Sequence, residues 1–128
     1  MENKPICEID YDGTKRWYLN GVYHREDGPA MEFADGRKQW CLNGKLHRLD
    51  GPAIENHDGH KQWWVNSKCH RLDGPAIEFA DGGSVWYFHG IRDSRVITQW
   101  AEENEIDLDN LTEVDKALIK LTWADYGK

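Results

Sequence analysis

The heptapeptide His47-Arg48-Leu49-Asp50-Gly51-Pro52-Ala53 occurs three times in this chain, and only its third residue changes. The other copies occupy residues 24–30 and 70–76, so successive copies lie 23 residues apart without an insertion. Further residues keep the same period: Trp17, Trp40, Trp63 and Trp86, and the Asp-Gly pairs that begin at Asp12, Asp35, Asp58 and Asp81. Agreement at so many positions identifies an internal repeat.

Each repeat predicts two antiparallel strands. Residues 30–34 alternate between apolar and polar side chains, as a half-buried strand does. Asp35-Gly36 supplies the positive φ of a hairpin turn, and residues 38–43 form the return strand. Proline in the heptapeptide removes a ladder donor, which suits the connection to the next unit. Counting two strands per unit gives about seven or eight antiparallel strands.

The tail predicts two amphipathic helices. Thr112 with Asp115 forms a variant of the capping box that opens the second helix. The expected apolar faces are Val96, Ile97, Trp100 and Ala101 in the first helix, and Val114, Ala117, Leu118 and Leu121 in the second. The sequence therefore predicts a mainly β protein, with a β-hairpin repeat region at residues 1–93 and a two-helix C-terminal cap at residues 94–128.

The return strands carry apolar side chains on both faces. Trp40 and Leu42 point one way with their repeat equivalents, and we expect the tryptophans to be mainly core. The opposite set is Tyr18, Cys41, Trp64 and Tyr87. A half-solvated antiparallel strand should be polar on one face, so something must account for this second set. We favour cover by the tail helices, and the alternative is an exposed aromatic strip that binds a partner.

Composition bounds the classes of function. The chain has 128 residues, enough for one domain with a modest core, and a net charge of -7. Negative charge argues against direct binding of nucleic acid through a basic face. No apolar run is long enough to cross a membrane, and Met1 leads into no apolar leader, so a cytoplasmic location is expected. Three cysteines without a CxxC pair fit a reducing compartment.

The chemistry-bearing residues do not assemble into a catalytic site. Repeat-equivalent histidines such as His47 should lie one repeat apart, roughly 10 Å, whereas a metal needs donors that converge on one point. We expect His and Asp of the heptapeptide to bond the inter-repeat turns, and Arg to pair with a carboxylate. No nucleophile–base pair or phosphate-binding glycine loop is recognisable, so we expect neither an enzyme nor a cofactor.

An acidic run marks the tail. Residues 102–115 contain seven carboxylates and no basic residue. The carboxylates are Glu102, Glu103, Glu105, Asp107, Asp109, Glu113 and Asp115. Such a run is usually a solvated face. The alternative is an acidic surface that docks on a basic groove and competes with nucleic acid.

At Trp40-x-x-Asn43-Gly44-Lys45-x-His47, followed by Asp58-Gly59, the chain resembles the MORN repeat family. The resemblance covers roughly residues 5 to 93. The chain carries His-Arg-x-Asp-Gly-Pro-Ala where the family typically has His-Gly-x-Gly, a variant similar to those of phage, large-virus and bacterial proteins. The resemblance implies an elongated sheet of hairpins used for protein contacts, self-assembly or lipid contact, although the departure and the acidic charge count against lipid.

These observations predict a non-catalytic protein-binding or scaffold module. The expected partner surface combines the second aromatic set with the tail carboxylates: Tyr18, Cys41, Trp64, Tyr87, Glu102, Glu103, Glu105, Asp107 and Asp109. One alternative is a small acidic inhibitor, of the kind that a phage would carry, that occludes a nucleic-acid-handling host protein. Another is a binder of a small anionic ligand such as a nucleotide, with the His-Arg pairs as donors. Exposed outer strands are also compatible with a homodimer paired edge to edge.

Overall fold

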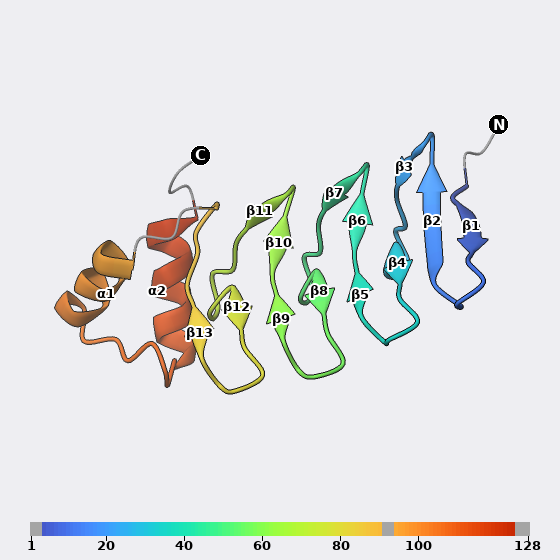
Figure 1. Ribbon diagram of the computed structural model, residues 1–128. Coiled ribbons are helices and arrows are strands. Elements are labelled where there is room, and N and C mark those ends of the chain that lie inside the picture. Colours follow the sequence, from blue (N-terminus) through green and yellow to red (C-terminus); the bar gives the residue numbers. More distant parts are fainter. Residues whose placement is uncertain (1–3, 91–93, 125–128) are drawn as a thin grey trace.

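The computed structural model describes residues 4–90 and 94–124 (Figure 1). The strands are β1 (Ile6–Ile9), β2 (Lys15–Leu19), β3 (Val22–Tyr23), β4 (Met31–Glu32), β5 (Lys38–Gln39), β6 (Cys41–Leu42), β7 (Lys45–Leu46), β8 (Ile54–Glu55), β9 (Lys61–Gln62), β10 (Trp64–Val65), β11 (Lys68–Cys69), β12 (Ile77–Glu78) and β13 (Ser84–Val85). Within these residues nine strands form one antiparallel sheet, in the order β1-β2-β4-β5-β8-β9-β12-β13 with β3 paired to β2. Helices α1 (Ser94–Glu103) and α2 (Glu113–Trp123) follow, so the predicted mainly β fold with two C-terminal helices is confirmed.

Two kinds of tight turn produce the hairpins. At the turn between β4 and β5, Gly36 has a φ of +94°, and the Asp35 carboxylate accepts a hydrogen bond of 2.9 Å from the Arg37 amide. At the other end of the unit, Asn43 and Gly44 have φ values of 51° and 79° between β6 and β7. Two positive φ values in a two-residue loop are the signature of a type I′ turn, which suits the twist of paired strands.

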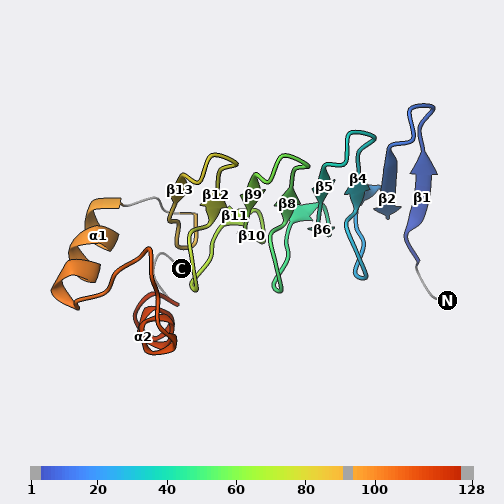
Figure 2. The same ribbon diagram turned by 90° about the horizontal axis from the view of Figure 1, so that it is seen from below.

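Two return strands are interrupted at their tryptophan, with β5 and β6 flanking Trp40 and β9 and β10 flanking Trp63, whereas β2 runs through Trp17. The amide of Trp40 donates to the Ala53 carbonyl at 2.8 Å, and its own carbonyl accepts from the His47 amide at 3.0 Å. The chain therefore passes from the main sheet into the short hairpin β6–β7. Successive short hairpins are also joined, for example by the Gly44 amide donating to the Tyr23 carbonyl at 2.9 Å. The units consequently stand side by side in one elongated row (Figures 1 and 2).

Small residues form the core of the repeat region. Ala30, Ala53 and Ala76 are completely buried where the heptapeptide loops meet the sheet, and Cys41 and Cys69 are almost so. The repeated tryptophans are only partly buried. The tryptophans, expected to be mainly core, are therefore half-buried, and alanines fill the fully buried positions where the loops approach the sheet.

The tail helices and the last unit form an apolar cluster. Phe88 of the last unit packs with Ile97 of α1 and with Ile119 and Trp123 of α2. The Phe88 and Trp123 rings stack with their centroids 4.9 Å apart. Partly buried side chains surround this cluster: Leu72, Trp86, Trp100, Leu108 and Leu111. The helices thus cap the C-terminal end of the row (Figure 2).

This packing corrects two predictions. The helices cover Trp86 and Phe88, which lie on the face of the tryptophans, and not the opposite set to which Tyr87 belongs. The predicted apolar stripe of α2 is also wrong, since Val114 and Leu121 are 78% and 84% exposed. The capping box of Thr112 and Asp115 is confirmed, so the helix starts where expected but faces the sheet with a different side.

The boundary predicted between the repeat region and the cap, at residues 93 and 94, adjoins a segment outside the described residues. Of the helices that the structure describes, neither is long and apolar enough to cross a membrane.

Candidate binding surface

The arginine of each heptapeptide is held by three groups: a tryptophan ring, an aspartate carboxylate and a proline carbonyl. The Arg48 guanidinium carbon lies 3.9 Å from the centroid of the Trp40 ring, a cation–π contact. Arg48 Nε donates to the Asp50 carboxylate at 3.1 Å, and Nη1 donates to the Pro52 carbonyl at 3.0 Å. Arg25 and Arg71 repeat the arrangement on their own tryptophan, aspartate and proline. The expected pairing of Arg with a carboxylate is confirmed.

The glycine of the heptapeptide leaves space for that arginine. A Cβ added to Gly51 would lie 2.8 Å from the Arg48 guanidinium carbon, and Gly28 and Gly74 are similarly close to Arg25 and Arg71. The guanidinium is therefore enclosed between the tryptophan ring and the glycine backbone. Glycine is required here because it has no side chain, a use separate from its role in turns of positive φ.

The histidine of each heptapeptide caps a turn of the following unit. His24 Nδ1 accepts a hydrogen bond of 2.9 Å from the Asn43 amide, and His47 Nδ1 accepts one of 3.1 Å from the Asn66 amide. Since Nδ1 is the acceptor, a neutral ring carries its proton on Nε2. The expected turn-bonding role of histidine is thus confirmed. In the described part of the chain no group of three His, Cys, Asp or Glu residues is placed to hold a metal ion.

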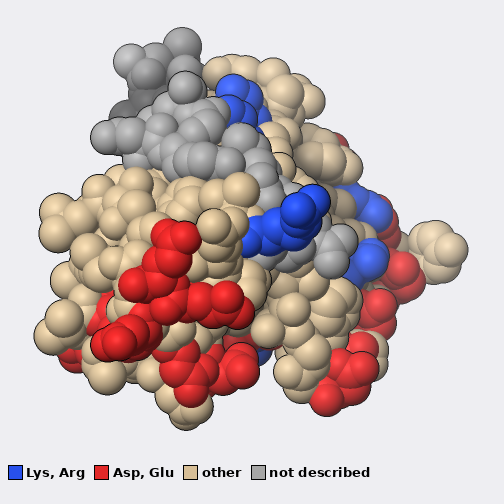
Figure 3. Space-filling model, turned by 90° about the vertical axis from the view of Figure 1, so that its left-hand side faces the viewer, with Lys and Arg blue, Asp and Glu red and all other residues tan. Residues whose placement is uncertain are grey.

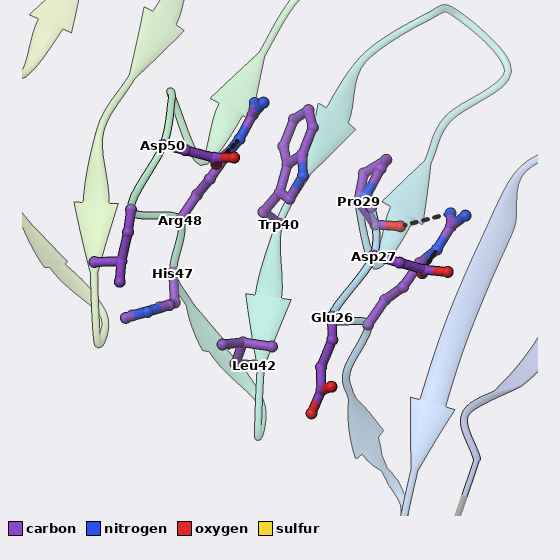
Figure 4. Close-up of a pocket in the computed structure, with 11 residues that line it drawn as sticks. Glu26, Asp27, Pro29, Trp40, Leu42, His47, Arg48 and Asp50 are labelled. Carbon is purple, nitrogen blue, oxygen red and sulfur yellow. Dashed lines mark hydrogen bonds and ion pairs between the residues drawn. The ribbon is translucent and has the colours of Figure 1, made fainter.

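Grooves open between successive heptapeptide loops on the face that bears the tryptophans, here called the tryptophan face. The groove over Trp40 has a volume of about 630 Å³ and a floor made by Trp40 and Leu42 (Figure 4). One loop contributes Glu26, Asp27 and Pro29 to its walls, and the next contributes His47, Arg48, Leu49 and Asp50. The result is an aromatic and aliphatic floor between two charged rims.

The same groove recurs along the row. Trp17 with Leu19, and Trp63 with Val65, floor neighbouring grooves of about 500 Å³ each, although in the first of these Lys4 and Pro5 take the place of one loop. We name the three after their tryptophans: the Trp17, Trp40 and Trp63 grooves. Their rims carry aspartates such as Asp27, whose pKa is lowered by the hydrogen bond and the charge of Arg25. The Asp27 carboxylate therefore stays ionised, and its charge offsets that of Arg25.

The second aromatic set lies on the face opposite the tryptophans. Trp64 and Tyr87 come together there and line a separate hollow of about 390 Å³ with Cys69 and Ile77. The Trp64 indole donates to the Gln62 side chain at 2.8 Å. Cys41 is buried, and its Sγ is therefore removed from any partner.

Tyr18 stands at the other end of the row from Trp64 and Tyr87. Its ring lies 5.0 Å from that of Tyr23, and the hydrogen bond between the two phenols raises the pKa of Tyr18. The structure therefore brings two of the four predicted aromatic-face residues into one hollow and leaves the other two apart from it.

The predicted acidic residues gather on the end of the molecule. Their side chains are exposed at the C-terminal end of α1 and in the turn that follows it: Glu102, Glu103, Glu105, Asp107 and Asp109. Figure 3 shows acidic side chains clustered on this end face. Hydrogen bonds from Asn110 and from the Asp109 amide lower the pKa of Asp107, so it remains ionised.

The grooves of the tryptophan face were missed at the level of sequence. The available signal is the variable third position of the heptapeptide, where Leu49 and Leu72 stand among charged and turn-forming residues. Because a leucine contributes nothing to the turn itself, its presence in such a loop indicates that the loop packs against another surface. In comparisons with known proteins, no family model, curated protein or solved structure matches the chain.

Proposed function

We propose that this chain is a non-catalytic module that binds a protein through the tryptophan face. The repetition of one groove along that face carries the proposal. Partly exposed indole rings beside an aliphatic floor, with a charged rim, have the composition of a protein–protein interface. Leu49, 80% exposed on the wall between two grooves, is the kind of apolar side chain that a partner would cover. The resemblance to MORN repeats points to the same class of function.

The geometry gives less support to a small anionic ligand. The arginines offered as its donors already bond an aspartate and a proline carbonyl and lie flat on a tryptophan ring. A phosphate would have to displace these contacts and approach the neighbouring carboxylates.

A photo-reactive amino acid at position 49 of the full chain tests the proposal. We expect irradiation in the native host to produce a discrete covalent adduct with another protein at this position. The matched control places the same group at Tyr11, which is fully exposed in a terminal turn. Absence of an adduct at position 49, or the same adducts at both positions, would count against protein binding by the tryptophan face.

The acidic end face supports a second candidate, an inhibitor that occludes a nucleic-acid-handling protein (Figure 3). Exposed carboxylates close together produce a field that a basic groove would recognise. Neutralising Glu102, Glu103 and Glu105 as glutamines should then abolish a strongly salt-weakened interaction, whereas the same change at Glu8 on β1 should not. A binding affinity that changes neither with salt concentration nor with these substitutions would eliminate this candidate.

A further inference from the structure

The groove series has a fourth position, and the chain itself fills it. In the last unit Trp86 and Phe88 stand where Trp63 and Val65 floor the Trp63 groove. Helix α2 lies on this position, because Ile119 and Trp123 pack against Phe88. The molecule thus contains one occupied example of the surface that it repeats in open form.

The walls of the two positions also correspond. Leu72, on the loop before Trp86, packs against the helical cluster. Its repeat equivalent Leu49, on the loop before Trp63, is 80% exposed. The two equivalent leucines therefore differ in exposure because a helix covers Leu72 and no helix covers Leu49.

Charge follows the same pattern. Lys120 of α2 reaches the rim of the Trp63 groove, which Asp73 also lines. The Asp73 side chain is 51% exposed, whereas the equivalent Asp50 is 88% exposed. A helix in the Trp63 groove would meet Asp50 as α2 meets Asp73, so a basic residue beside its apolar ridge would be favoured.

The spacing of the row suits a second helix. Units of two strands repeat at roughly 10 Å, and packed helices have axes about 8–10 Å apart. Helix α2 runs alongside β13 in Figure 1. A helix one unit further along the row would therefore lie parallel to the strands and beside α2 at an ordinary packing distance.

We infer that the Trp63 groove binds an amphipathic helix of a partner protein, with two large apolar side chains one turn apart and a lysine or arginine next to them. This inference rests on the proposed function and specifies its partner. The apolar pair would occupy the places that Ile119 and Trp123 occupy on Phe88, covering Leu49 and Val65. The basic residue would pair with Asp50.

A helix-stapled peptide of residues 111–124, added to the full chain, tests this inference. The staple joins the positions of Ala117 and Leu121, which face away from the sheet in the intact protein. We expect saturable binding that shifts the indole N–H resonance of Trp63 and leaves that of Trp86 in place. Replacing the peptide's Ile119 and Trp123 positions by alanine should remove binding.

Substitutions in the protein locate the site. Leu49→Glu should weaken peptide binding by about tenfold or more, as loss of a central interface side chain does. Leu121→Glu, at an equally exposed leucine outside the grooves, should leave it unchanged.

Three outcomes would overturn the helical partner. They are no binding of a peptide proven helical, a shift confined to Trp86, and equal binding of an extended peptide of the same composition. In each case the cross-linking at position 49 still decides whether the face binds a protein at all. Failure of the inference is therefore distinguishable from failure of the proposed function.

Discussion

At the scale of single residues, Gly51 shows why the heptapeptide tolerates so little change. Its Cα faces the Arg48 guanidinium, which is fixed by Trp40, Asp50 and the Pro52 carbonyl. Gly51→Ala should therefore lower the free energy of unfolding by about 1–3 kcal/mol, because the new methyl group displaces the guanidinium from these contacts. Urea denaturation measures the change.

A double-mutant cycle checks that cause. Once Arg48→Ala has removed the guanidinium, the methyl group at position 51 has nothing to displace. The combined variant should therefore be less destabilised than the sum of the two single variants, by about 1 kcal/mol. Additive effects would show that Gly51 acts through its backbone and not through Arg48.

The cysteines should differ sharply in reactivity. Cys7 is exposed, whereas Cys41 and Cys69 are buried. Burial raises the pKa of the Cys41 thiol, and it raises the pKa of Cys69 to about 12. Since the thiolate is the reactive form, at about pH 8 a thiol reagent should modify one group quickly in the native protein and three after denaturation. Native Cys7→Ser should show no fast reaction, and a fast reaction there would contradict the packing.

At the scale of elements, the sequence was most informative where structure is local. Asp35-Gly36 and Asn43-Gly44 specify their turns through their own backbone preferences, and both turns are present. Thr112 and Asp115 likewise specify the start of α2. The side that α2 turns toward the sheet depends instead on Phe88, a residue distant in the chain. Helical spacing alone therefore selected the wrong apolar stripe, since α2 carries large apolar residues on more than one side.

Alanine substitutions in α2 separate these sides. Ile119 is completely buried, so Ile119→Ala should cost about 2–5 kcal/mol through lost packing and a cavity. Leu121 is 84% exposed, and Leu121→Ala should change stability by no more than about 0.5 kcal/mol. Thermal unfolding of both variants gives the comparison. Equal losses would place the predicted stripe against the sheet after all.

At the scale of the whole molecule, the row of units was predictable and the grooves along it were not. The constant period of the repeat determines how the units stack. Each groove, in contrast, depends on how the loops of two neighbouring units are placed around a tryptophan, as the loops that carry Asp27 and Asp50 are placed around Trp40. The predicted aromatic set follows from strand alternation, which separates two faces without showing which one the helices cover. Cys41 illustrates this limit, because alternation placed it correctly and gave no warning that it is buried.

The open edge of the sheet leads to a prediction about self-association. β1 pairs with β2 alone in the described part of the chain, and its Ile6 is 70% exposed. Free edge groups beside apolar side chains favour pairing between copies, so we expect a concentration-dependent homodimer. Ile6→Lys should shift it toward monomer in sedimentation experiments, while Val22→Lys, at a partly exposed valine of a short hairpin, should not. A wild-type chain that stays monomeric at high concentration would contradict the prediction.

The histidine contacts bear on how such a chain can change length. Each unit gives a ring nitrogen to the turn of the unit after it, as His24 does for Asn43 and His47 for Asn66. Duplication of one unit would therefore supply both a new donor turn and a new acceptor ring, and neither end of the row would need redesign. Adding or removing whole units would then change the length of the tryptophan face in equal steps, and no new kind of contact between units would be required.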